Sequence, residues 1–232
     1  LAYMSSTILN DINDENIDDI NMPYRPLQRK ALTKKAAYTT SLSLASISFI
    51  VSALLSIQII VLLIFFFVLA FFYSAPPLLM SRKVALAQIT LASTAVATPL
   101  YAGMVYSKTS FLHPSLPYLF ILFMTLLAIF TFIIKDFKDI KGDKLSGKMT
   151  LVTRIGAKNT QKIAFVGTLF SYPSLILTFN IIHPINSLTT LLLALVLTEL
   201  LVAESLAIKK PESSFAGVRM GFFTLLLVLL LS

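Results

Sequence analysis

Two clusters of three aspartates share one spacing, three and then four residues apart. The first acidic motif contains Asp11, Asp14 and Asp18, and the second, 125 residues later, contains Asp136, Asp139 and Asp143. On a helix this spacing places three carboxylates along one face, each about a turn from the next. Like charges that close repel unless a cation lies between them, and Mg²⁺ takes oxygen ligands while keeping positions open for phosphates. We therefore expect two Mg²⁺-binding faces that together clamp one diphosphate.

The composition is that of a membrane protein with several helical spans. The 232 residues are 56% hydrophobic and only 13% charged, whereas roughly 25% is typical of soluble domains. There is no cysteine, which excludes disulfides, thiolate metal sites and cysteine nucleophiles. The net charge of +8 is read as a topology signal rather than as a nucleic-acid site. His113 and His183 each precede a proline and are predicted to be solvated loop residues.

Hydropathy predicts an all-α bundle with seven complete transmembrane spans and an N-terminal stub that is too short to cross a bilayer. The first two spans are separated by so few residues that they should form a tight helical hairpin. Pro99 is expected to kink the third span. The predicted spans are about Ala36–Ser56, Gln58–Phe72, Val84–Tyr106, Tyr118–Ile134, Thr160–Phe179, Ser187–Ala207 and Phe215–Leu231.

The basic residues give a consistent orientation. If the first acidic motif is cytoplasmic, alternation of the spans places 18 of the 19 Lys and Arg residues on or near that side, and only Lys108 lies opposite. The positive-inside rule is then satisfied, and both acidic motifs open to the cytoplasmic side of the cell membrane.

The repeated motif also predicts an internal duplication. Four spans separate the two motifs, and a pair of spans precedes the second one, so two pseudo-repeats of four helices would surround a central cavity. Only the stub precedes the first motif. We therefore expect residues 1–232 to be a single membrane-embedded domain that lacks its first helix and most of its second.

Both motifs resemble the signatures of the UbiA-type intramembrane prenyltransferases. The first matching run is Asn10-Asp11-x-x-Asp14-x-x-x-Asp18 with Pro23-x-Arg25-Pro26-Leu27. The second is Lys135-Asp136-x-x-Asp139-x-x-Gly142-Asp143-x-x-x-Gly147-x-x-Thr150 with Arg154-x-Gly156. Members of this family have nine transmembrane helices with acidic loops after the second and sixth, which agrees with the expected truncation.

The resemblance implies roles for individual residues. Asn10 and all six motif aspartates would bind Mg²⁺ and diphosphate, and Asp139 or Asp143 would position or deprotonate the acceptor. Tyr73, which is expected to contact substrate, begins a Tyr-Ser-Ala-Pro-Pro run that is similar to a loop in chlorophyll synthases and homogentisate prenyltransferases. In that loop a basic residue follows the prolines within a few positions, whereas Arg82 and Lys83 come later here.

Four further predictions concern charged residues outside the triads. Arg25 and Lys135 are the basic residues expected to contact diphosphate. Glu199 lies at membrane depth, which marks an ionisable residue as a functional candidate, and it is expected to line the acceptor cavity. Glu204, nearer the cytoplasmic end, is expected to touch only headgroups or water.

These features together predict a prenyltransferase. A diphosphate site at the mouth of an apolar bundle suits a polyprenyl diphosphate. When this substrate ionises, the faces of aromatic side chains can stabilise its allylic cation. The acceptor would be an aromatic compound or a glycerol-phosphate lipid, in quinone or membrane-lipid biosynthesis. One alternative is a CDP-alcohol phosphotransferase, but its Asp-Gly and Ala-Arg pattern is missing. Another is a divalent-cation transporter, which would favour carboxylates near the bilayer midplane.

Overall fold

Helices are the only regular secondary structure in the part that the computed structural model describes, residues 1–107 and 115–231. His113 and Lys108 lie outside those ranges. The chain forms two compact units. Unit 1 comprises the described residues of Leu1–Thr109 with Lys141–Thr150, and unit 2 comprises those of Ser110–Ile140 with Leu151–Ser232. The single membrane-embedded domain expected over residues 1–232 stays a prediction.

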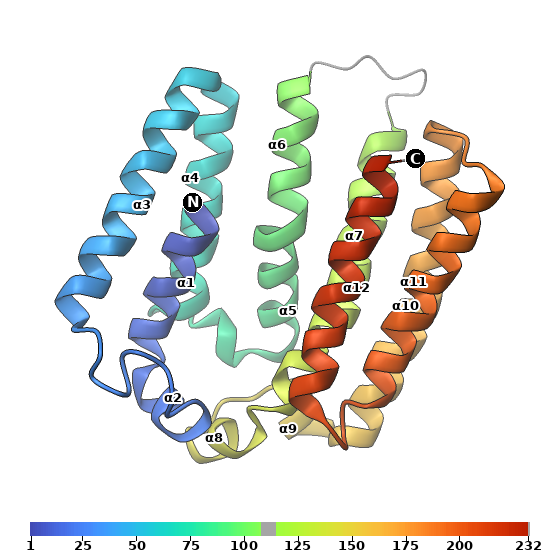
Figure 1. The fold of residues 1–232 in the computed structure, drawn as a ribbon. Coiled ribbons are helices and arrows are strands. Elements are labelled where there is room, and N and C mark those ends of the chain that lie inside the picture. The colour runs from blue at the N-terminus through green and yellow to red at the C-terminus, as the bar shows by residue number, and fades with distance from the viewer. Residues whose placement is uncertain (108–114, 232) are drawn as a thin grey trace. The chain divides into compact units, whose positions relative to one another are not determined.

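All seven predicted spans are confirmed as helices long and apolar enough to cross a membrane. In unit 1 they are α3 (Lys34–Leu55), α4 (Ile57–Ser74) and the run of α5 (Val84–Ala92), η2 (Ser93–Ala97) and α6 (Thr98–Ser107). In unit 2 they are α7 (Leu116–Phe132) with η3 (Ile133–Phe137), α10 (Ala157–Ile182), α11 (Ser187–Ser205) and α12 (Pro211–Leu231). Figure 1 shows these helices along the chain.

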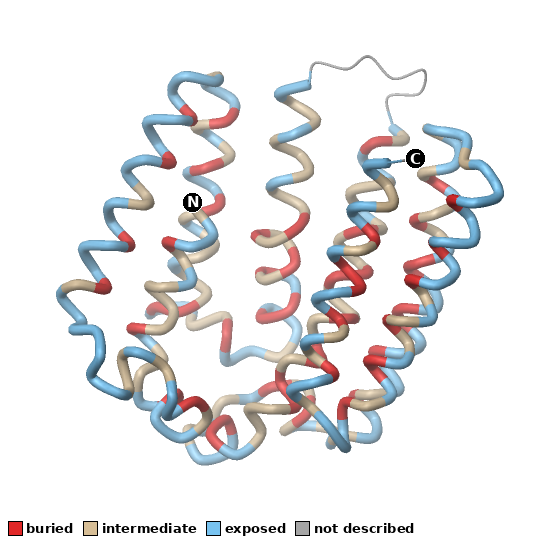
Figure 2. Tube along the Cα trace, viewed as in Figure 1, coloured by how far each residue is buried: buried red, intermediate tan, exposed pale blue. Residues whose placement is uncertain are grey.

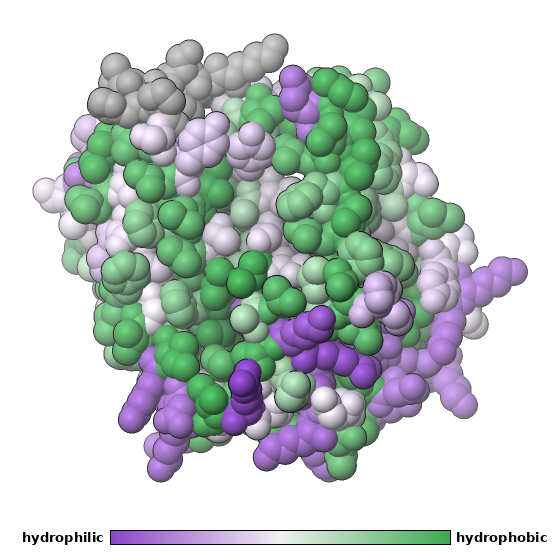
Figure 3. Space-filling view, turned by 180° about the vertical axis from the view of Figure 1, so that it is seen from behind, coloured by the Kyte–Doolittle hydropathy of each residue, from purple (hydrophilic) through white to green (hydrophobic). Residues whose placement is uncertain are grey.

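The long helices expose much of their apolar surface. In Figure 2 exposed residues run along the length of most of these helices, and in Figure 3 apolar side chains cover them while hydrophilic ones gather mainly at their ends. Leu54, Phe170 and Leu230 are among the large apolar side chains that are exposed. Exposure of this apolar surface to water would be unfavourable, whereas the hydrocarbon core of a lipid bilayer accommodates it.

Serine side chains hold the short helix α1 (Ala2–Asn13) against α3 in unit 1. The Ser5 hydroxyl donates to the Ser41 carbonyl at 2.8 Å, and the Ser41 hydroxyl donates to the Ser5 carbonyl at 2.9 Å. Such small residues let two helices approach closely in a membrane. At the predicted hairpin, Ser56 alone separates α3 from α4, and its hydroxyl accepts from the Ile59 amide at 3.3 Å.

The third span accommodates Pro99 through a π-helical turn. A proline cannot donate the backbone hydrogen bond of a regular α-helix. The π-helix Ser93–Ala97 lies just before Pro99, and the Thr98 hydroxyl donates to the Ser93 carbonyl at 2.8 Å. The structure thus shows a local change of helix type just before Pro99, and the kink expected at Pro99 stays a prediction.

Close approaches between helices fix the packing of unit 2. A Cβ added at Gly167 of α10 would lie 2.5 Å from Cδ2 of Phe130 on α7, so only glycine fits there. The Tyr172 hydroxyl donates to the Leu193 carbonyl at 2.7 Å and joins α10 to α11. The Ser214 hydroxyl donates to the Ala203 carbonyl at 2.6 Å and joins α12 to α11.

The acidic motifs do not lie on continuous helices. This differs from the single helical face that their spacing suggested. In the first motif α1 ends before Asp14, and α2 (Glu15–Asn21) begins after it. In the second, η3 ends at Phe137, and α8 (Ile140–Leu145) follows a turn. Asn and Asp side chains compete with helical hydrogen bonds, and both runs are rich in these poor helix formers.

Candidate functional site

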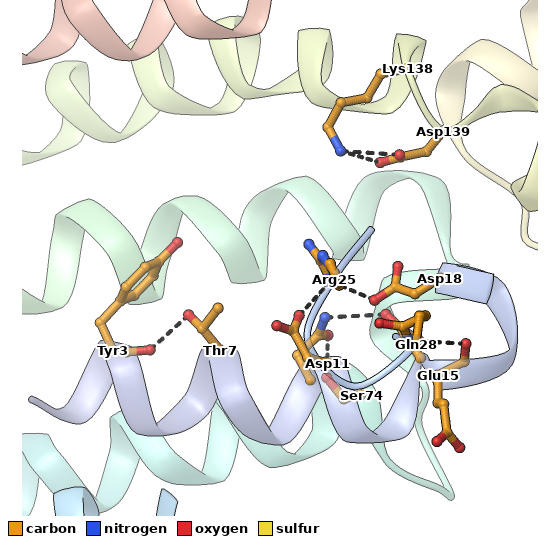
Figure 4. Close-up of polar contacts among 12 residues, drawn as sticks. Tyr3, Thr7, Asp11, Glu15, Asp18, Arg25, Gln28, Ser74, Lys138 and Asp139 are labelled. Carbon is orange, nitrogen blue, oxygen red and sulfur yellow. Dashed lines mark hydrogen bonds and ion pairs between the residues drawn. The ribbon is translucent and has the colours of Figure 1, made fainter. Parts of the chain in front are cut away.

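Arg25 joins the two ends of the first acidic motif. Its Nη1 donates to Asp11 Oδ1 at 2.6 Å and also to Asp18 Oδ2. Pro23 and Pro26 flank Arg25 in the connection after α2, and its amide donates to the Met22 carbonyl at 3.0 Å. Figure 4 shows the guanidinium pointing toward both carboxylates. The basic side chain expected to contact diphosphate therefore lies within the acidic motif itself.

Asn10 links the motif to the end of α4. Its Oδ1 accepts from the Ser74 hydroxyl at 2.6 Å, and its Nδ2 donates to Asp14 Oδ2 at 3.2 Å. The amide thus fixes one oxygen of Asp14 while Ser74 fixes the amide. Tyr73, the residue before Ser74, is half-buried in the last turn of α4. Its contact with substrate stays a prediction, as does any role for Arg82 or Lys83.

The first motif carries more negative charge than Arg25 offsets. The pKa of Asp18 is raised to about 6, chiefly by burial and also by the nearby Asp11 and Asp14, although Arg25 acts in the opposite direction. Among the described residues, Asp14 has no ion-pair partner. A further cation at this motif would favour ionised Asp18.

A side chain from the first motif's helix fixes part of the second motif within unit 1. Asn21, the last residue of α2, accepts the Gly142 amide of α8 with its Oδ1 at 2.8 Å. A Cβ at Gly142 would lie 2.5 Å from Asn21 Cγ, so a larger residue at this position would displace the Asn21 side chain. The contact joins residues 121 positions apart and fixes the start of the segment that carries Asp143.

Asp143 is fully buried next to Gly142 in unit 1. Its Oδ1 lies 3.6 Å from Lys148 Nζ, and its carbonyl accepts from the Lys148 amide at 2.8 Å. A buried carboxylate is costly without a compensating charge, so Lys148 stabilises its ionised form. Gly147 sits between them in the chain with φ of 69°, a conformation that favours glycine.

The other two aspartates of the second motif lie in unit 2, each beside a lysine. Asp136 is buried, and its Oδ1 lies 3.0 Å from Lys135 Nζ. Lys138 Nζ lies 3.1 Å from Asp139 Oδ1 and 3.3 Å from Oδ2, as Figure 4 shows. The predicted basic residue Lys135 is therefore held at the motif by an ion pair.

The two glutamates of α11 differ from expectation. Glu204 was expected at headgroups or water, but it is fully buried, so that prediction is wrong. Its Oε1 accepts from the Thr168 hydroxyl at 2.6 Å, because α10 packs directly against this part of α11. Glu199 is half-buried, and a Cβ at Gly221 of α12 would lie 3.8 Å from its Cδ. Its place in an acceptor cavity stays a prediction.

Several polar partners escaped the sequence reasoning. For Lys138, the only sequence signal was its position directly before Asp139 of the motif. Lys148 lies five residues after Asp143, which is no regular helical spacing. Nothing in the sequence pairs residues as far apart as Asn21 with Gly142 or Ser74 with Asn10, since those contacts arise from tertiary packing.

Comparison with known proteins identifies the family to which this site belongs. The sequence matches the model of the UbiA prenyltransferase family over residues 1–227. The chain belongs to the UbiA prenyltransferase family. Together with its seven apolar helices, this membership makes the chain an integral membrane protein.

One UbiA relative is the digeranylgeranylglyceryl phosphate synthase of Sulfurisphaera tokodaii. It is 31% identical over 186 residues, which cover 78% of this chain and 65% of the relative. The chain thus spans slightly less than two thirds of that relative's length.

Solved UbiA structures share the fold. A UbiA homologue from Aeropyrum pernix K1 has a TM-score of 0.72 at 19% identity, covering 97% of this chain and 85% of that one. A homologue from Archaeoglobus fulgidus, solved with GPP and Mg²⁺, has a TM-score of 0.68 at 16% identity, covering 96% of this chain and 86% of that one.

The first acidic motif has the donor chemistry for Mg²⁺. Its ligands would be carboxylate oxygens of Asp11, Asp14 and Asp18 with the amide oxygen of Asn10, all hard donors. Among the described residues, no three Asp, Glu or His side chains are grouped to hold a single ion. Arg25, which contacts two of these carboxylates, stands where positive charge is needed.

Proposed function

We propose that the protein transfers a polyprenyl group, such as geranylgeranyl, from its diphosphate to the hydroxyl of a glycerol-phosphate lipid. In this reaction the allylic carbon–oxygen bond breaks, and its electron pair leaves with the diphosphate. The acceptor oxygen forms a new bond to that carbon and loses its proton. Bound Mg²⁺ would stabilise the charge of the departing diphosphate.

The observation that carries this proposal is the pairing of carboxylates with basic side chains at both motifs. Arg25 at the first motif and Lys135 at the second are held in place by ion pairs with carboxylates. Each side chain is therefore already ordered near the site and can exchange its carboxylate partner for a phosphate. Asn10 orients Asp14. The three aspartates of each motif are proposed as the ligands of Mg²⁺.

Asp139 and Asp143 are the proposed acceptors of the proton. Asp139 is partly exposed beside Lys138, whereas Asp143 is buried beside Lys148. A carboxylate that is reachable and ionised can take a proton from a hydroxyl that it contacts. The greater exposure favours Asp139 as the base and Asp143 as a residue that positions the motif.

A glycerol-phosphate acceptor is supported by the relative from Sulfurisphaera tokodaii, whose name specifies a glyceryl phosphate product. The prenyl diphosphate donor and Mg²⁺ are supported by the Archaeoglobus fulgidus homologue that was solved with both GPP and Mg²⁺. The cytoplasmic opening of the site is supported by the bias of basic residues toward one side of the predicted spans.

The test is turnover by the intact purified protein in detergent or vesicles. Geranylgeranyl diphosphate, Mg²⁺ and geranylgeranylglyceryl phosphate should yield diphosphate and a lipid heavier by one geranylgeranyl group, as read by mass spectrometry. EDTA should stop the reaction. Homogentisate in place of the lipid tests the aromatic alternative. Release of no diphosphate with either acceptor would refute the proposal.

A further inference from the structure

Phe215 places two cations beside the second acidic motif within unit 2. Lys138 Nζ lies 6.0 Å from the centroid of the Phe215 ring, and Arg219 Cζ lies 5.9 Å from it. Both distances are within the range of cation–π attraction. Phe215 and Arg219 are one turn apart on α12, whereas Lys138 follows η3. We call Lys138, Phe215 and Arg219 the Phe215 cluster.

The two cations of the Phe215 cluster differ in their partners. Lys138 contacts both oxygens of Asp139. Arg219 is exposed and has no carboxylate partner among residues 1–107 and 115–231. Glu212, the carboxylate in the first turn of α12, lies seven residues away and is not paired with it. The cluster therefore presents a guanidinium that is positioned by an aromatic ring and whose charge is not neutralised.

The surface beyond Arg219 is apolar along the same face of α12. Phe223, Leu226, Leu227 and Leu230 follow Arg219 at helical spacings of four, seven, eight and eleven, and all four are exposed. A guanidinium binds phosphate through a fork of parallel hydrogen bonds. A ligand with a phosphate at one end and a hydrocarbon chain at the other would match both features.

We propose that the Phe215 cluster binds the phosphate of the glycerol-phosphate lipid acceptor through Arg219. The proposal rests on the proposed function for the identity of the reaction, and it assigns the acceptor's headgroup to residues outside both aspartate triads. Because Lys138 joins the cluster to Asp139, a phosphate at Arg219 would bring the acceptor to the proposed base. An acceptor without an anionic group would gain nothing from this contact, so the cluster also discriminates between anionic and uncharged acceptors.

The kinetic test separates acceptor from donor. In Arg219→Gln, KM for geranylgeranylglyceryl phosphate should rise by about 10- to 100-fold, as expected when a charge-assisted hydrogen bond is lost. KM for geranylgeranyl diphosphate should stay within about twofold of the wild-type value, as uncoupled binding sites require. Arg219→Lys keeps the charge but not the fork and should lie in between. Phe215→Leu should raise the acceptor KM by about two- to fivefold through loss of the cation–π contact.

Lys209→Gln is the matched control, because Lys209 is an exposed cation just before α12 and lies outside the Phe215 cluster. Both KM values should be unchanged in that variant. A rise in the donor KM for Arg219→Gln would assign the guanidinium to the diphosphate and overturn the proposal. Unchanged kinetics in Arg219→Gln would overturn it as well.

A binding measurement keeps the inference separate from the reaction itself. Native mass spectrometry of the detergent-solubilised protein would follow adducts with dioleoyl phosphatidic acid and with dioleoylglycerol, which lacks the phosphate. The wild type should retain the phosphate lipid preferentially, and Arg219→Gln should lose that preference. Equal retention by both proteins would refute the Phe215 cluster as a phosphate site. Failure of catalysis with preserved binding would instead refute the proposed function.

Discussion

In the first acidic motif one guanidinium contacts two carboxylates, whereas in the second each carboxylate has a lysine within five residues of it along the chain. Arg25 reaches Asp11 and Asp18, and Asp14 has no ion-pair partner among the described residues. In the second motif the pairs are Lys135 with Asp136, Lys138 with Asp139 and Lys148 with Asp143.

This difference in basic partners implies different roles for two motifs whose aspartates have identical spacing. The first motif has an excess of negative charge, which adds to burial in raising the pKa of Asp18, and it should attract a divalent cation on its own. In the second motif each aspartate has its own lysine, and Lys141 and Lys144 add positive charge to the same segment. Its aspartates should therefore gain metal contacts only when a diphosphate arrives and draws the lysines toward its own charge. Aspartate spacing alone could not distinguish these two states, because the difference comes from the basic residues.

Removing one aspartate from either motif should have the largest effect. Asp14→Ala and Asp139→Ala should each lower kcat/KM by more than about 100-fold, because even residues that only support metal ligands cost 10- to 100-fold. Diphosphate release with saturating Mg²⁺ is the measurement. Asp19→Asn is the control, since Asp19 is an exposed carboxylate on α2 outside the triad. A comparable loss in that variant would show that total charge matters more than position.

Replacing the shared guanidinium should have the next largest effect. Arg25→Gln leaves Asp11 and Asp18 without their common partner, and we expect kcat/KM to fall by about 10- to 100-fold from the lost charge-assisted hydrogen bonds. Arg25→Lys should recover only part of this loss, because an ammonium lacks the planar guanidinium fork. Full activity in Arg25→Gln would mean that the guanidinium is dispensable.

Forcing α2 and α8 apart should have an intermediate effect. In Gly142→Ala the new Cβ would lie 2.5 Å from Asn21 Cγ, and such overpacking costs about 1–3 kcal/mol. The melting temperature in detergent and the activity should both fall. Replacing Asn21 by Ala in the Gly142→Ala protein should restore part of the stability by making room. Gly103→Ala is the control, because a Cβ there meets nothing within 4 Å, and its melting temperature should not fall.

The smallest effect is expected at the second motif's buried pair. Lys148→Gln keeps a polar group near Asp143 but removes the charge, and we expect an activity loss of about 3- to 30-fold, since a paired charge contributes roughly 1–2 kcal/mol at partly buried sites. A loss larger than that of Arg25→Gln would reverse the ranking of the two motifs. Steady-state diphosphate release measures both variants under the same conditions.

The sequence predicted the spans well because lipid imposes a simple rule on them. Each of the seven long helices, from α3 to α12, is a run of apolar residues bounded by polar or helix-breaking ones, and hydropathy detects such runs directly. The same approach correctly placed the α3–α4 hairpin.

The site was less predictable because tertiary contacts determine it. The spacing of Asp11, Asp14 and Asp18 suggested a single helical face, but Asp14 interrupts the helix. The burial of Glu204 depends on Thr168 from another helix, and the Asn21–Gly142 contact depends on two segments far apart in the sequence. No local pattern specifies such pairings.

The difference between the motifs can be tested most directly by metal binding without substrate. Mn²⁺, which replaces Mg²⁺ and is visible by electron paramagnetic resonance, would be titrated into the intact wild-type protein, Asp14→Asn and Asp139→Asn. We predict that the wild type and Asp139→Asn bind Mn²⁺ with similar affinity, while Asp14→Asn binds it at least about 10-fold more weakly. Equal weakening in both variants, or no binding to the wild type until diphosphate is added, would contradict an excess of negative charge confined to the first motif.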